Sequence, residues 1–337
     1  MRFIYRGRRH PLPAIRRLRQ VGERAGADRD PDIPLDVTHV FIDGSIDAVP
    51  EGAFREHPNI EEVFFHDNVE RIEDYAFTCC PRLKKVVMPG VKSTGRYTFG
   101  GCLHLTDVQC DKLGFIDDST FFECRSLRSI NLPSAETVEC DAFMTCTLLT
   151  SVKFGSKLDS IEGGAFNDCH FLERITIPLR GDMFWCDSLL DGCKHFKHVD
   201  LVEEAALRET IAALHLEEWR NDMIAEFDSI GAQILNKKED KAGAIRNWMR
   251  QLLFKIEDYT TQHRHVLNEA ATTLGLALWE TSISECHNVI ESVPTRAECR
   301  VLCGAEIVIK NVLPFLDLPP HTFEVCTDYD DEDDGWA

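Results

Sequence analysis

The chain contains one sequence unit that recurs every 22 to 24 residues. Each unit is built around a large apolar anchor, and successive anchors are 23, 22, 22, 22, 23 and 24 residues apart. The anchors are Phe54, Phe77, Phe99, Phe121, Phe143, Phe166 and Leu190. A repeat of this length predicts a solenoid, in which each coil stacks on the next because one coil has too little apolar surface to fold alone.

Further columns of the repeat follow each anchor at fixed distances. A cysteine stands three residues after six of the anchors, and His57 takes that place in the first unit: Cys80, Cys102, Cys124, Cys146, Cys169 and Cys193. An apolar residue follows three positions later: Ile60, Leu83, Leu105, Leu127, Leu149, Leu172 and Phe196. Beyond it, apolar and polar residues alternate, as in Val86-Val87-Met88 and Ile130-Asn131-Leu132. This alternation predicts one short, half-buried strand in each coil.

The complete unit reads without interruption in residues 76–89, from Ala76-Phe77 through Cys80 and Leu83 to Pro89. It resembles the BspA-type leucine-rich repeat, whose hallmark is Ala-Phe-x-x-Cys-x-x-Leu. The resemblance covers about residues 35–201 and implies an α/β solenoid, a right-handed stack of coils with a short parallel β-sheet. We expect a partial turn at Val37, Val40 and Ile42 to start the stack. The last coil should be distorted, because Leu189-Leu190 replaces the usual Ala-Phe.

The repeated cysteines have two interpretations. We favour buried structural thiols, since free cysteine packs as a small apolar residue. Neighbouring strands lie about 4.8 Å apart, whereas a disulfide needs converging Cβ atoms about 3.8 Å apart. The alternative is a redox or metal-binding column. The chain has 14 cysteines, and without disulfides that number favours a reducing compartment.

The strand positions between the buried columns are the candidate protein-binding face, because solenoids use this concave sheet for binding. Over seven coils its formal charge is +1 with histidine neutral, which suits a protein partner better than a phosphate backbone. Only Phe64 is aromatic among these positions, so we expect no aromatic stripe. The alternative is a solvated face without a ligand. The candidate residues are Glu61, Glu62, Phe64, Lys84, Lys85, Val87, Asp107, Gln109, Arg128, Asn131, Lys153, Arg174 and Thr176.

Charge is distributed unevenly along the chain. The formal net charge is −20, which argues against binding to nucleic acid or to an anionic membrane. No apolar run approaches the roughly 18 residues of a membrane helix. Residues 1–34 are predicted to be a basic flexible tail, and residues 319–337 an acidic one. The N-terminus lacks the apolar core of a secretory signal. We therefore expect a cytoplasmic protein, with a nuclear signal or an organelle transit segment as alternatives.

After residue 201 the 22-residue period ends and helical spacing begins. Residues 202–318 are predicted to be an all-α domain with helices over 203–229, 244–259 and 262–283 and a loop at 236–241. A capping box at Thr295 and Glu298 predicts a fourth helical segment, and the apolar run 313–320 should dock across the helices. This domain either covers the last coil as a cap, or it provides a surface for self-association or for binding a helix of a partner.

No sequence motif for catalysis or phosphate binding appears in the chain. Two groups of residues are candidates to bind a metal ion, but neither has a standard zinc spacing. The first group is Cys186, Cys193, His195 and His198, and the second is Cys299, Cys303, His321 and Cys326. We therefore expect a non-catalytic protein-binding or scaffold protein with no cofactor or metal. The alternative is an enzyme or enzyme regulator with a pocket in the helical domain lined by Trp219, Trp248 and Trp279.

Overall fold

The structure, a computed structural model, describes residues 1–7, 30–214, 216–231 and 241–287. Two compact units divide the chain: unit one is Met1–Glu204 with Ser229–Met249, and unit two is Ala205–Asp228 with the chain from Arg250 onward. The predicted loop at 236–241 lies almost wholly outside the described residues. So do the fourth helical segment, the run 313–320 and the acidic tail 319–337.

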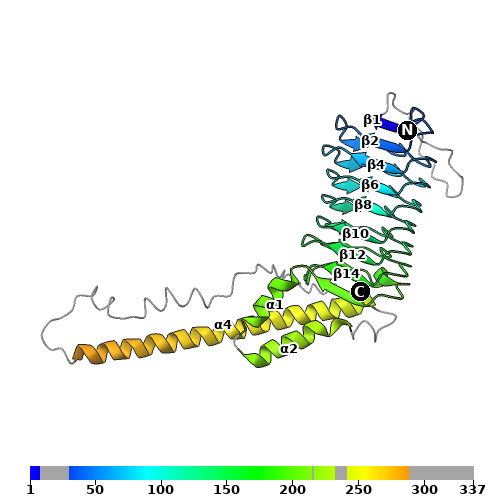
Figure 1. The fold of residues 1–337 in the computed structure, drawn as a ribbon. Coiled ribbons are helices and arrows are strands. Elements are labelled where there is room, and N and C mark those ends of the chain that lie inside the picture. Colours follow the sequence, from blue (N-terminus) through cyan, green and yellow to red (C-terminus); the bar gives the residue numbers. More distant parts are fainter. Residues whose placement is uncertain (8–29, 215, 232–240, 288–337) are drawn as a thin grey trace, which may run out of the picture. The chain divides into compact units, whose positions relative to one another are not determined.

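Unit one is a stack of coils, and each coil contributes one long strand to the same side (Figure 1). The strands are parallel and form two sheets, ordered β1-β2-β4-β6-β8 and β10-β12-β14-β16. We call the outward side of both sheets the long-strand face. Its strands are β1 (Arg2–Tyr5), β2 (His39–Ile42), β4 (Glu62–Phe65), β6 (Lys85–Val87), β8 (Asp107–Gln109), β10 (Ser129–Leu132), β12 (Ser151–Phe154), β14 (Arg174–Ile177) and β16 (His198–Leu201).

A second, shorter strand follows each long strand from β2 to β14. These strands form one uninterrupted parallel sheet ordered β15-β13-β11-β9-β7-β5-β3. Each of these strands has two residues, and in β3 to β13 the second residue is buried in the core, as Ile72 and Val138 are. The bounds are β3 (Ala48–Val49), β5 (Arg71–Ile72), β7 (Ser93–Thr94), β9 (Phe115–Ile116), β11 (Thr137–Val138), β13 (Ser160–Ile161) and β15 (Phe184–Trp185).

The anchor side chains form a single file through the centre of the stack. From Phe54 to Phe166 the six rings are fully buried, and each lies face to face with the next. Centroids are 4.7, 5.5, 5.5, 5.1 and 5.3 Å apart along the file. The predicted stack of coils is therefore confirmed, and each of the four inner rings, from Phe77 to Phe143, lies between the anchor rings of the two neighbouring coils.

The cysteine column ties each coil to the one before it. Every thiol in the column donates a hydrogen bond to the carbonyl of the preceding anchor, from Cys80 Sγ to Phe54 O (3.1 Å) through Cys193 Sγ to Phe166 O (3.2 Å). In the first unit His57 Nε2 contacts Pro34 O at 3.0 Å instead. Burial raises the pKa of the Cys146 thiol to about 12, so it stays protonated and able to donate. Among the described residues all cysteines are free.

Two backbone positions with positive φ bracket the anchors, at two residues before and two residues after. Glycine takes this conformation without strain, and it occurs in both columns, as Gly164 and Gly101 do. Elsewhere Tyr75, Ser119 and Thr145 adopt it, at φ values of 59°, 56° and 61°. The tight turn that brings each anchor into the file is thus a property of the coil and not of one residue type.

The N-terminal residues correct the prediction of a flexible tail over 1–34. Residues 2–5 form β1, which pairs in parallel with β2. Tyr5 is buried, its ring meets Phe54 edge-on at 4.9 Å, and its hydroxyl donates to Asp30 Oδ2 at 3.2 Å. The stack therefore begins one coil before Val37. The arginine-rich composition hid a short apolar alternation, Phe3 and Tyr5, that is sufficient for one strand.

At the other end the last coil departs from the repeat, as predicted. A 3-10 helix, η1 (Asp187–Leu190), replaces the regular turn before the anchor. Residues 229–249 belong to the same unit as the coils, and Lys241 Nζ donates to Cys193 O in this coil. Ile245 and Trp248 are buried. The first turns of the long C-terminal helix therefore act as a cap on the solenoid.

The bounds of the described helices differ from the prediction. The segment 203–229 forms two helices, α1 (Glu204–Ala212) and α2 (Glu217–Asp228). The segments 244–259 and 262–283 are one continuous helix, α4 (Lys241–His287), because no proline or glycine interrupts it at residues 260–262. The boundary between the two units falls within α4.

Unit two is held together by contacts between α2 and α4. The rings of Trp219 and Tyr259 stack at 5.4 Å, and Tyr259 donates from its hydroxyl to Asp222 Oδ2 at 2.8 Å. Lys255 Nζ lies 3.0 Å from carboxylate oxygens of both Asp222 and Glu226. Hydrogen bonds from Tyr259 and Lys255 lower the pKa of Asp222.

The ring file predicts a strong contrast between inward and outward positions. Phe121→Ala should lower the free energy of unfolding by about 3–5 kcal/mol, because it removes a buried ring. Thr106→Ala should cost less than about 1 kcal/mol, since Thr106 is exposed and its hydroxyl makes one hydrogen bond to Lys84 O. Denaturant unfolding of both variants measures the difference. Equal midpoints would contradict the assigned core.

Candidate protein-binding face

The structure places every predicted site residue on the long-strand face. Ten lie within strands β4 to β14, and Glu61, Lys84 and Arg128 stand one residue before a strand. All of them are exposed or half-buried. The alternation read from the repeat therefore assigned the outward side chains correctly. Whether they bind a partner is a separate question, which depends on how their charges and apolar groups are arranged.

An apolar row crosses the first four strands of this face. Ile4, Phe41, Phe64 and Val87 are in register from β1 to β6. The rings of Phe41 and Phe64 stack at 5.2 Å with an interplanar angle of 14°. Ile4 is exposed, and the other three side chains are half-buried. The expectation that no aromatic side chains would line up here is wrong, because the rows read from the sequence began at Glu61 and omitted Phe41.

Ion pairs between neighbouring coils flank the apolar row. Lys84 Nζ lies 3.0 Å from Glu61 Oε2, and Lys85 Nζ lies 3.1 Å from Asp107 Oδ2. The hydrogen bond and the charge of Lys84 lower the pKa of Glu61. Further along the face, Arg174 Nη1 contacts both carboxylate oxygens of Asp200 at 2.7 Å. Much of the charge at the two ends of the face is thereby neutralised within the protein.

Two cations in the middle of the face have no such partner. Arg128 precedes β10, Lys153 lies on β12, and both are exposed. Within the described ranges neither side chain forms an ion pair. The nearest carboxylate in the column of Arg128 is that of Glu173, two coils away. A positive region therefore lies at the centre of the face, in a chain whose net charge is −20.

The ladder of backbone hydrogen bonds between the long strands is interrupted between β8 and β10, next to Arg128. No strand pairing joins β8 to β10, although the short strands on these coils, β9 and β11, remain paired. Val108 on β8 is half-buried, whereas Val63, Val86 and Ile130 at the same position of other coils are buried. The long-strand face is thus opened between these two coils. We call this interruption the sheet break.

A different side of the stack is acidic. The turns after the short strands carry Asp117, Asp118, Glu139, Asp141 and Glu162. Burial raises the pKa of Glu139, and the charges of Glu162, Asp117 and Asp118 raise it further. Burial and the charge of Asp118 also raise the pKa of Asp141. These carboxylates repel one another across adjacent coils.

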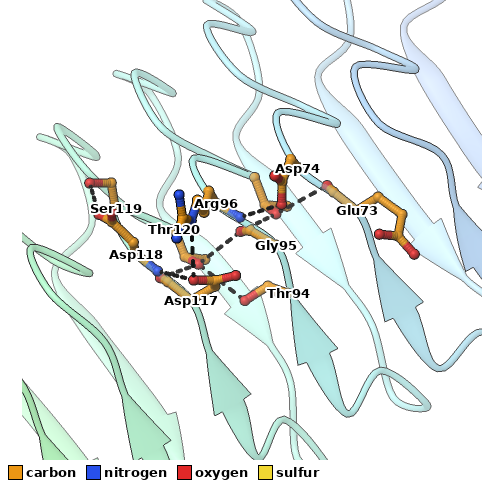
Figure 2. Close-up of polar contacts among 10 residues, drawn as sticks. Glu73, Asp74, Thr94, Gly95, Arg96, Asp117, Asp118, Ser119 and Thr120 are labelled. Atoms are coloured by element: carbon orange, nitrogen blue, oxygen red, sulfur yellow. Dashed lines mark hydrogen bonds and ion pairs between the residues drawn. The ribbon is translucent and has the colours of Figure 1, made fainter. Parts of the chain in front are cut away.

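Hydrogen bonds within and between coils hold these turns together (Figure 2). Thr120 Oγ1 donates to Asp117 O at 2.8 Å and lies 3.1 Å from Thr94 Oγ1. Arg96 donates its backbone N–H to Asp74 Oδ1 at 2.9 Å. This explains why threonine can replace alanine before the anchor: the buried hydroxyl finds backbone acceptors. The contacts in Figure 2 therefore show that the polar residues of these turns stabilise the fold.

In the part of the chain that the structure describes, the residues of the other candidate sites do not form clusters. Cys193 is buried in the cysteine column, while His195 stacks on Phe171 at 5.1 Å. Trp248 is buried in unit one, Trp219 stacks on Tyr259 in unit two, and the side chain of Trp279 lies outside the described residues. The group Cys299, Cys303, His321 and Cys326 also lies outside them. Where the structure is described, no three His, Cys, Asp or Glu residues are placed to hold a metal ion, and no helix could span a membrane.

The acidic turns predict a pH-dependent effect of Glu139→Gln. Because the pKa of Glu139 is raised in the folded state, its ionisation destabilises the fold. The variant should be more stable than the parent near pH 7, by up to about 1 kcal/mol. This gain should vanish as pH falls below the ordinary glutamate value of 4.5, where the parent is protonated in both states. Thermal unfolding across this pH range tests it, with the exposed Glu136→Gln as control. A gain that does not change with pH would refute the explanation.

Comparison with known proteins gives a family and several structural neighbours. The model of the BspA-type leucine-rich repeat region matches six copies over residues 35–137 and 114–206. Leucine-rich repeat proteins from Eubacterium ventriosum and Bacteroides ovatus are 23% and 19% identical, with TM-scores of 0.40 and 0.34. These alignments cover 43% and 51% of this chain.

The same alignments cover only 41% and 53% of those two proteins. A leucine-rich repeat protein of T. pallidum is 19% identical, with a TM-score of 0.36 and coverage of 53% of this chain and 84% of its own. No curated protein matches the chain. Six copies of the repeat over half of its length show that the chain belongs to the BspA-type leucine-rich repeat family.

Proposed function

We propose that the protein is a non-catalytic protein-binding or scaffold protein and that the long-strand face is its binding surface. The observation that carries this proposal is the apolar row Ile4, Phe41, Phe64 and Val87. Apolar side chains that stay partly exposed next to polar groups are typical of a protein interface. The row lies where neighbouring ion pairs already neutralise each other, so a partner would not have to desolvate unpaired charge there.

The dimensions of the face favour a partner that binds through a short extended segment. Nine long strands at about 4.8 Å per step make the face about 38 Å long, and four residues per strand make it about 13 Å wide. The resulting area of about 500 Å² is smaller than the ~800 Å² that each partner contributes to a typical stable interface. An extended segment of about eleven residues would fit the length of the face.

Two earlier expectations remain predictions. A cytoplasmic location is compatible with the free thiols, which favour a reducing compartment. Self-association through the C-terminal helices would use exposed side chains of unit two such as Ile224 and Phe254. Neither is needed for the binding function proposed for unit one.

The test is a pair of matched phenylalanine substitutions. Phe64→Arg charges the apolar row, whereas Phe115→Arg charges an exposed phenylalanine on the short-strand sheet. Affinity capture from the native cell with quantitative mass spectrometry should show that Phe64→Arg loses the retained proteins about tenfold or more, while Phe115→Arg retains them. Both variants should unfold at similar denaturant concentrations. Equal capture by both variants would show that the long-strand face is not the binding surface.

A further inference from the structure

We propose that the sheet break is a carboxylate-binding subsite, and that the partner of the long-strand face is an extended acidic segment with an apolar anchor residue. This inference rests on the proposed function and names the chemistry of the partner. Three observations support it: backbone donors without acceptors, cations without counterions, and the distance from both to the apolar row.

The sheet break leaves backbone donors without their usual acceptors. At the other steps of the stack, the carbonyl of the residue before a long strand accepts one or two N–H groups of the next coil; Lys84 O, for example, accepts the N–H groups of Thr106 and Asp107 at 2.9 and 3.0 Å. Among the described residues, Thr106 O accepts neither of the corresponding N–H groups, those of Arg128 and Ser129. An unpaired N–H group favours an acceptor when it becomes buried. A partner that covers the break would have to supply that acceptor.

The side chains around the break favour a negatively charged acceptor. Arg128 and Lys153 are exposed and have no ion pair in the part of the chain that the structure describes. The carboxylate next to the break, Asp107, is already paired with Lys85 at 3.1 Å. A guanidinium binds a carboxylate through two parallel hydrogen bonds. The unpaired N–H groups and the cations therefore favour the same kind of ligand atom, a carboxylate oxygen.

The distance from the break to the apolar row sets the spacing in the partner. Phe64 on β4 is three strand steps from Arg128, about 14 Å at about 4.8 Å per step, and its column lies three residues, about 10 Å, further along the strand direction, so the two positions are about 17 Å apart. An extended chain advances about 3.3–3.6 Å per residue. A segment that crosses the strands obliquely would therefore place its apolar residue on Phe41 and Phe64 about five residues from an Asp or Glu at the break. A basic segment would be repelled by Arg128 and Lys153.

The experiment is an unbiased selection of random 12-residue displayed peptides on the full chain, with counter-selection on Phe64→Arg. We expect enriched peptides to carry Asp or Glu about five residues from an aromatic or large aliphatic residue. Synthetic peptides of the enriched sequences should lose affinity about tenfold for Arg128→Glu in fluorescence polarisation. Lys157→Glu is the matched control, because it makes the same charge change at an exposed lysine outside the long strands, and affinity should be nearly unchanged. Arg128→Gln replaces the first variant if charge reversal unfolds the chain.

The outcomes separate this inference from the proposed function. Peptides that require Phe64 but lack acidic residues, or bind Arg128→Glu as tightly as the parent, would overturn the carboxylate subsite and leave the binding face intact. Failure to enrich any peptide that requires Phe64 would count against both. Acidic peptides that require both Phe64 and Arg128 would support both.

Discussion

Each coil of unit one leaves its anchor ring uncovered on both sides until another coil covers it. The six stacked rings from Phe54 to Phe166 are the interaction on which the rest of the solenoid depends. Their spacing of about 5 Å matches the distance between neighbouring parallel strands, so rings, cysteines and both sets of strands repeat with one period. The fold is therefore a chain of nearest-neighbour contacts, and its ends need special residues. Tyr5 covers the first ring, and the start of α4 closes the last coil.

The same regularity leaves the long-strand face free to vary. Inward positions must be apolar in every coil, while outward positions have no such requirement. Across nine strands the outward side chains change from the apolar row, through the unpaired cations Arg128 and Lys153, to the pair of Arg174 and Asp200. A binding surface can therefore be assembled coil by coil without loss of the core. The sheet break shows that even a backbone interruption is tolerated, because the rings and the short strands continue across it.

Sequence alone predicted those features that repeat. The anchor file, the cysteine column and the outward positions follow from residue type at fixed spacing, and all are present in the structure. Features that occur once were missed: β1 lies in an arginine-rich segment, and Phe41 precedes the first complete unit. The positive φ positions have a signal in retrospect, since Gly52, Gly101, Gly164 and Gly192 fall in the same two columns. The sheet break has no sequence signal that we can identify, because it depends on how two coils meet.

Neighbouring coils stabilise one another through the ring file. Hydrogen exchange of the full chain carrying Phe143→Ala, measured by mass spectrometry against the parent, tests it most directly. Amide protection should fall in the mutated coil and also in the coils of Phe121 and Phe166, because each shares a ring contact with Phe143. Loss of protection confined to the coil of Phe143 would contradict it, since each coil would then carry its own stability.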